Sequence, residues 1–80
     1  MSKIDFLKEA LTNKGFIYSN VGDYGITIEF NESKIIMWET IQDTIYIKVL
    51  DANNNKVFKK TYKSINNIIK YGIIKNKYIQ

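Results

Sequence analysis

The side chains available for chemistry in this chain are carboxylates, lysines, hydroxyls and phenols, because the sequence contains neither cysteine nor histidine. A serine or cysteine nucleophile normally acts with a base whose pKa lies near neutrality, and the usual partners are therefore missing. Disulfides and thiolate or imidazole metal sites are excluded for the same reason. Only catalysis built on carboxylates, lysine or tyrosine remains open to this sequence.

Four acidic residues are expected near one end of the predicted sheet: Glu29, Glu32, Glu39 and Asp43. A carboxylate pair there could bind a divalent cation or act as acid and base. Solvated charges at turns and strand ends are the more common explanation of such a group. The four glycines fit neither a P-loop nor a dinucleotide fingerprint. We therefore expect no enzymatic activity, no cofactor and no metal.

Lysines and aromatic residues alternate in the C-terminal third of the chain. Residues 52–80 hold seven of the twelve lysines and none of the eight acids, and residues 56–63 read KVFKKTYK. This alternation suits nucleic acid, because lysine offsets phosphate charge and aromatic rings stack on bases. Arginine, which most often reads guanine edges, is absent, so such binding would be salt-sensitive and without sequence preference. The candidate residues are Lys59, Lys60, Tyr62 and Lys63.

A second candidate is an aromatic group on the central strands. If Trp38, Tyr46 and Lys48 share the sheet face that points away from the helices, they resemble the aromatic anchors of protein interfaces. Thr27, Glu29 and Ile36 are expected on the same face. The alternative is a tryptophan that covers its own core, because a register slip of one residue would bury Trp38 and expose Met37.

Two hairpins are predicted to carry these side chains. In residues 43–62, Ile45, Ile47 and Val49 alternate with polar or larger residues, and the loop DANNN at 51–55 is typical of a turn. A second hairpin spans residues 24–39. With Glu32-Ser33 as its loop, Phe30 would face Ile35 and Ile28 would face Met37. Which face of residues 57–62 meets the core stays open.

Helices are predicted at both ends. Ser2 and Asp5 match a capping box, Ile4, Leu7 and Leu11 recur at helical spacing, and Gly15 is a natural stop, so the first helix should span residues 3–14. The second should begin at Ile65 with Ser64 as N-cap. We favour an end near Gly72 with residues 73–80 as a partly docked tail. Alternatively, Gly72 allows close approach to the sheet and the helix runs on toward Asn76.

The expected fold is therefore a two-layer α+β domain covering residues 1–80. Its small antiparallel sheet should have four strands, within a range of three to five, flanked by an N-terminal and a C-terminal helix in the order α-β-β-β-β-α. The residues of a fifth strand would be 16–18. No apolar run approaches the ~18 residues of a spanning helix, and residues 1–15 lack the pattern of a secretion signal, so we expect a cytoplasmic protein without membrane contact.

The composition adds a hypothesis about origin. Ile, Asn and Lys fill 36 of the 80 positions, as in proteins from AT-rich genomes, and codon bias is a second explanation of the lysines. The chain thereby resembles small accessory proteins of phages and mobile elements in low-GC Gram-positive bacteria, including inhibitors of host defence such as anti-CRISPR proteins. This likeness rests on composition and involves no particular residue.

Two functional hypotheses follow. The first is a non-enzymatic protein that binds and inhibits a host protein or nucleoprotein complex. The second is a sequence-nonspecific nucleic-acid-binding module that uses the basic C-terminal third. A homodimer is a further expectation, because the apolar tail residues Ile73, Ile74, Tyr78 and Ile79 would be costly to leave exposed.

Overall fold

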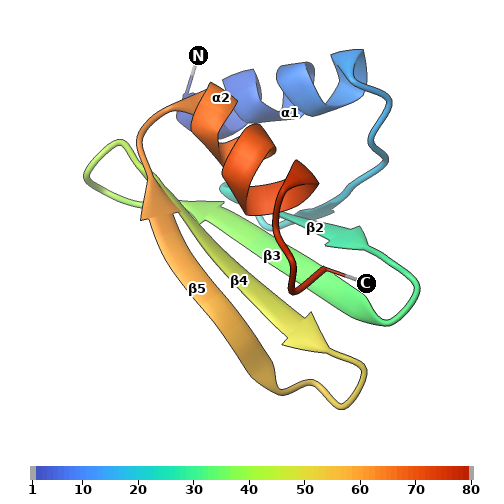
Figure 1. Ribbon diagram of the computed structural model, residues 1–80. Coiled ribbons are helices and arrows are strands. Elements are labelled where there is room, and N and C mark those ends of the chain that lie inside the picture. The colour runs from blue at the N-terminus through green and yellow to red at the C-terminus, as the bar shows by residue number, and fades with distance from the viewer. Residues whose placement is uncertain (1, 80) are drawn as a thin grey trace.

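The computed structural model describes residues 2–79 and contains a five-stranded antiparallel sheet with helices over one face (Figure 1). The strands lie in sequence order, so each one pairs with its neighbours along the chain. The predicted two-layer α+β class is confirmed, with five strands in place of four. The elements are α1 (Lys3–Asn13), β1 (Ser19–Val21), β2 (Gly25–Glu29), β3 (Ser33–Glu39), β4 (Ile45–Asp51), β5 (Lys56–Tyr62), α2 (Ile65–Asn67) and the π-helix η1 (Ile68–Ile74).

The core forms between the helices and alternate residues of the three central strands. Each strand contributes every second side chain, as expected when one face of a sheet is covered. The fully or almost fully buried residues are Ile26 and Ile28 of β2, Ile35 and Met37 of β3, Ile45, Ile47 and Val49 of β4, Ile4, Leu7 and Leu11 of α1, and Ile68, Ile69 and Ile73 of η1. Burial of one such side chain contributes roughly 1.5–3 kcal/mol.

The register between β2 and β3 differs from the predicted one by two residues. Ile28 faces Ile35, and the Phe30 N–H donates to the Ser33 carbonyl at 2.8 Å, so the two-residue loop is Asn31-Glu32. The prediction placed this loop one residue too late. A shift of two leaves every side chain on its predicted face, because side chains alternate with a period of two. Met37 is therefore buried and Trp38 lies on the opposite face.

Helix α1 begins and ends within one residue of its prediction. The Ser2 N–H donates to the Asp5 carboxylate at 3.4 Å, as in a capping box, and Gly15 follows the helix with φ = +84°. The Ile4 N–H, one of the amides that a helix start leaves without a helical partner, donates to Glu39 Oε1 at 2.8 Å. This bond fixes the start of α1 to the end of β3.

The first strand was predicted at residues 16–18 and lies instead at Ser19–Val21. The Phe16 N–H donates to the Leu11 carbonyl at 2.9 Å, which ties residue 16 to the end of α1. Pairing with β2 therefore begins only at Ser19. Phe16 and Tyr18 pack against the core from this connection. Their apolar character, which suggested a strand, serves to cover the edge of the core.

The C-terminal helix does not end near Gly72. Ser64 caps α2 by accepting from the Asn67 N–H at 3.3 Å, as predicted, and the helix continues as η1 to Ile74. The Lys75 N–H bonds to the Lys70 carbonyl at 2.8 Å, five residues back, which is the π-helical pattern. A Cβ on Gly72 would lie 2.6 Å from Ile47 Cδ1. The close approach of Gly72 to the sheet, which was the alternative, is therefore confirmed, and the helix ends two residues short of Asn76.

The residues after η1 dock onto the molecule. Asn76 is buried and its Nδ2 donates to the Gly72 carbonyl at 2.9 Å, while the ring of Tyr78 stacks on Phe58 with centroids 5.6 Å apart. Ile73 is in the core and Ile79 packs against it, which leaves Ile74 largely exposed. The segment is therefore partly docked, as predicted, since Ile73 and Ile79 meet the core while Ile74 and Tyr78 keep exposed surface.

Candidate functional site

The sheet has an uncovered side, which we call the open face, opposite the helices (Figure 1). Its side chains form rows that run across the strands, because the five strands are paired in register. One row is Val21, Gly25, Trp38, Tyr46 and Thr61, and the next is Ser19, Thr27, Ile36, Lys48 and Lys59. Trp38, Tyr46 and Lys48 thus share this face with Thr27, Glu29 and Ile36, as the alternation predicted.

An aromatic pair lies on the two strands β3 and β4, near the end of β3 and the start of β4. The rings of Trp38 and Tyr46 have centroids 4.6 Å apart and planes inclined at 32°, and Lys48 Nζ lies 5.5 Å from the centre of the Trp38 ring. Trp38 and Tyr46 are directly opposite each other on β3 and β4. Such a ring pair contributes about 0.5–1.5 kcal/mol and a surface cation–π contact about 0.5–1 kcal/mol. The neighbours hold Trp38 in place while leaving it part-exposed.

The charges of the open face are mostly positive. Lys34, Lys48 and Lys59 lie on it together with one acid, Glu29. In the strand register, Glu29 of β2 lies opposite Lys34 of β3. Lys48 and Lys59 are direct neighbours on β4 and β5. Like charges directly opposite each other on a sheet are unfavourable, so folding gains nothing from this pair. A partner carboxylate placed between the two lysines would be attracted by both.

The basic stretch 56–63 does not form one surface. Lys59 lies on the open face, whereas Lys60 pairs with Ile47 and Tyr62 with Ile45, on the side of the helices. Lys60 Nζ lies 5.3 Å from the Tyr62 ring, and burial raises the pKa of the Tyr62 hydroxyl above its ordinary value. Lys63 follows β5, and its carbonyl accepts from Lys3 Nζ at 2.7 Å. Because successive side chains of a strand point to opposite faces, Lys59 lies on the open face and Lys60 and Tyr62 lie on the other.

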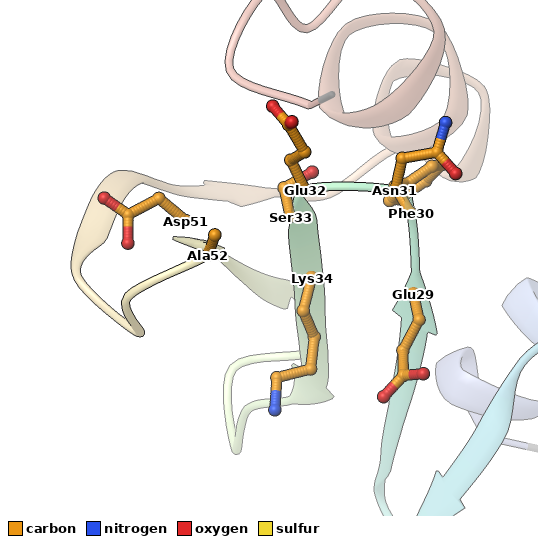
Figure 2. A pocket seen from close by; sticks show the side chains of 8 residues that line it. All are labelled: Glu29, Phe30, Asn31, Glu32, Ser33, Lys34, Asp51 and Ala52. Carbon is orange, nitrogen blue, oxygen red and sulfur yellow. The ribbon is translucent and has the colours of Figure 1, made fainter.

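The acidic residues are also divided. Glu29 and Glu32 lie at the β2–β3 loop beside Asp51, around a shallow depression of about 280 Å³, where the three carboxylates point away from one another (Figure 2). Glu39 and Asp43 lie at the other end of β3, a seven-residue strand roughly 20 Å long. The expected cluster at one end of the sheet is therefore wrong.

Structural contacts account for the second pair of acids. Glu39 accepts the Ile4 N–H at 2.8 Å, and Asp43 Oδ2 is 3.8 Å from Lys3 Nζ. Among residues 2–79 no three His, Cys, Asp or Glu side chains are placed to hold a metal ion together.

Sequence reasoning missed a hollow at Gly25. This hollow, about 320 Å³, lies between the turn after β1 and the Trp38 ring and is lined by Val21–Gly25 and Ile36–Glu39. A Cβ on Gly25 would lie 2.8 Å from the Val21 carbonyl oxygen, so the close approach of β1 requires glycine there. A glycine inside an alternating strand is a known sign of such an approach and could have indicated it.

No family model matches the chain, and no curated protein or solved structure matches it at a significant level. In the part of the chain that the structure describes, no helix has both the length and the apolar character needed to cross a membrane. The case for a function therefore depends on the geometry and chemistry of the open face.

Proposed function

We propose that this protein is a non-enzymatic cytoplasmic binding protein whose open face docks onto a larger host protein or complex. The observation that carries the proposal is the Trp38–Tyr46 ring pair, flanked by Lys48, on a sheet face that no helix covers. Tryptophan and tyrosine are enriched among the residues that dominate binding energies at protein interfaces. Their direct contact across β3 and β4, away from the edge strands, fits this role.

The charge of the open face indicates the chemistry of the partner. Three lysines against one acid favour an acidic surface, and the adjacent Lys48 and Lys59 are the strongest local attraction for carboxylates. Electrostatic complementarity of this kind raises the association rate more than the affinity. The ring pair would supply the buried contact, and the lysines would steer the approach.

Inhibition is the biological outcome that we propose for this binding. A compact domain without an evident catalytic group acts most directly by occupying a surface that the host protein or nucleoprotein complex needs. The composition, which resembles that of phage and mobile-element accessory proteins including anti-CRISPR proteins, supports this direction. If inhibition is the outcome, the purified domain should lower the activity of the complex that it captures, in proportion to the fraction bound.

Comparative capture from host lysate tests the proposal. The bait proteins are the wild type, the double variant Trp38→Ala/Tyr46→Ala, and Tyr71→Ala as matched control. Tyr71 is 47% exposed on the helical layer and carries Lys70 Nζ 5.2 Å from its ring, so it repeats the lysine–aromatic contact on the other side of the molecule.

A partner recovered by the wild type and Tyr71→Ala but lost with the double variant supports the open face. Equal recovery by all three proteins would remove the aromatic pair from the binding site. Circular dichroism of each bait excludes loss of folding as the cause of a lost partner.

A second candidate function is nucleic-acid binding, favoured by the position of Lys48 and Lys59 next to the ring pair. Stacking on aromatic rings with lysines along the backbone is a common mode of single-strand binding. Gel shifts at low salt on single- and double-stranded DNA and RNA separate the two functions. A shift that Lys48→Glu/Lys59→Glu abolishes, while Lys70→Glu/Lys75→Glu does not, would favour this candidate. No shift at micromolar protein would eliminate it.

A further inference from the structure

The hollow at Gly25 is a gap in an otherwise filled row of side chains. Val21 on β1 and Trp38 on β3 both pair with Gly25 and stand on either side of it. Gly25 itself has no side chain to place between them, and the packing of the Val21 carbonyl prevents the addition of one. The hollow, which we call the recess at Gly25, lies beside this close contact, between the β1–β2 turn and Trp38.

The lining of this recess is mainly apolar on the sides that face the sheet. Val21, Ile36 and Trp38 line it from the strands, and Asp23 and Tyr24 line it from the β1–β2 turn. The Glu39 carboxylate points to the helix side, where it accepts the Ile4 N–H. An aliphatic side chain fits these walls, whereas an acidic one would meet Asp23.

The cations lie on the other side of Trp38. Lys48 is on β4, two strands from Gly25 and one row along, which places its Cα roughly 12 Å from Gly25 by the usual strand and residue spacings. Lys59 is the next residue across. The open face thus presents an apolar recess and a cationic pair at a fixed separation, with Asp23 at the far end of the recess and Glu29 on the neighbouring row.

We infer that the partner docked on the open face inserts one aliphatic side chain into the recess at Gly25. The same partner segment places a carboxylate about 14 Å away, between Lys48 and Lys59. This inference rests on the proposed function and adds to it the chemistry of the recognised segment. In an extended chain, this separation corresponds to an acidic residue about four positions from the aliphatic one.

Two other occupants fit less well. A second copy of the protein would bring one net-positive open face against another, and like net charges oppose such a face-to-face dimer. The C-terminal tail of the same chain is docked elsewhere, with Tyr78 stacked on Phe58. A foreign acidic segment is the occupant that the charges favour.

A synthetic peptide tests the inference directly. The probe is Ac-Gly-Leu-Gly-Gly-Asp-Asp-Gly-amide, and the readout is the fluorescence of Trp38, the one tryptophan of the chain. We expect a saturable change in the millimolar range. At least tenfold weaker binding is expected when Leu is replaced by Ala or both Asp by Lys in the peptide. Absence of a saturable change, or equal binding of all three peptides, would overturn the inference.

A variant of the protein in which a larger side chain fills the recess complements the peptide test. Val21→Phe places a ring beside Trp38 without adding a second tryptophan, and Val57→Phe is the control on the opposite edge strand. The two valines are 51% and 37% exposed, so both changes should leave the core intact. Val21→Phe should weaken the Leu-containing peptide at least tenfold and Val57→Phe should not.

The same pair of variants separates this inference from the proposed function. If Val21→Phe captures the host partner as well as the wild type does, while Trp38→Ala/Tyr46→Ala loses it, the face binds but the recess is not used. If the double variant also retains the partner, the proposed function itself fails.

Discussion

The two faces of the sheet are built from the same strands, yet they follow different rules. On β3 and β4 the residues toward the helices are Ile35, Met37, Ile45, Ile47 and Val49, all fully buried. The residues between them point to the open face and include Trp38, Tyr46 and Lys48. Folding requires the first set, because it supplies the core. It does not require a part-exposed ring pair beside two adjacent lysines, which is why we propose that the open face binds a partner.

The largest effect should come from breaking the covered side. Leu7→Ala removes a fully buried side chain from α1 and should lower the free energy of unfolding by about 2–5 kcal/mol. Trp38→Ala should cost less, because Trp38 is only partly buried and loses mainly its contact with Tyr46. Urea unfolding measures both. An equal cost would mean that Trp38 serves the fold, and the comparison between the faces would fail.

A smaller effect tests the contact that sets the distance between η1 and the sheet. Gly72→Ala places a Cβ against Ile47 Cδ1 and should destabilise by roughly 1–2 kcal/mol, since overpacking costs more than the helix propensity of alanine returns. Ile47→Val removes that methyl group. The double variant should therefore be about as stable as Ile47→Val alone. Losses that simply add in thermal or urea unfolding would contradict this contact.

The charges of β5 allow a kinetic test. The triple variant Lys59→Ser/Lys60→Ser/Lys63→Ser should fold normally, because exposed lysines contribute little to stability. It should associate with the partner several-fold more slowly at low salt and little more slowly at high salt. The structure sharpens this prediction, because Lys59 alone is on the open face. If Lys60→Ser/Lys63→Ser slowed association as much as Lys59→Ser, the open face would not be the steering surface.

The smallest predicted effect is at Tyr62 on the covered side. Burial raises the pKa of Tyr62 above its ordinary value of 10.0, so the unfolded state loses this proton at a lower pH than the folded state. The free energy of unfolding should therefore fall as pH rises from about 10 through the raised pKa. Tyr62→Phe removes this contribution, so its stability should decline less steeply over that interval. Parallel curves for the two proteins would contradict the burial of this hydroxyl.

Most of the fold could be predicted because alternation and capping are local signals. The cap at Ser2 located α1, and the alternation on β3 put Trp38 on the correct face even though the register was two residues off. The end of η1 could not be predicted, because it depends on how closely Gly72 approaches Ile47. That distance exists only once the layers have packed.

The candidate site was predicted in part for the same reason. Trp38, Tyr46 and Lys48 lie on strands whose buried faces were evident from their isoleucines. On β5, by contrast, neither set of alternating residues is clearly apolar, so only the pairing with β4 could show that Lys59 and Lys60 are on opposite faces. The recess at Gly25 likewise requires knowledge of which residues flank it on β1 and β3.

Site-specific photocrosslinking tests the central claim most directly, because it reports which face touches the partner. A benzophenone amino acid is placed at Thr61, which lies exposed on the open face next to Tyr46, or at Ile74, which is 62% exposed on the helical layer. Irradiation in host lysate should give a specific adduct from position 61 and none from position 74. An adduct formed from position 74 alone would contradict binding through the open face.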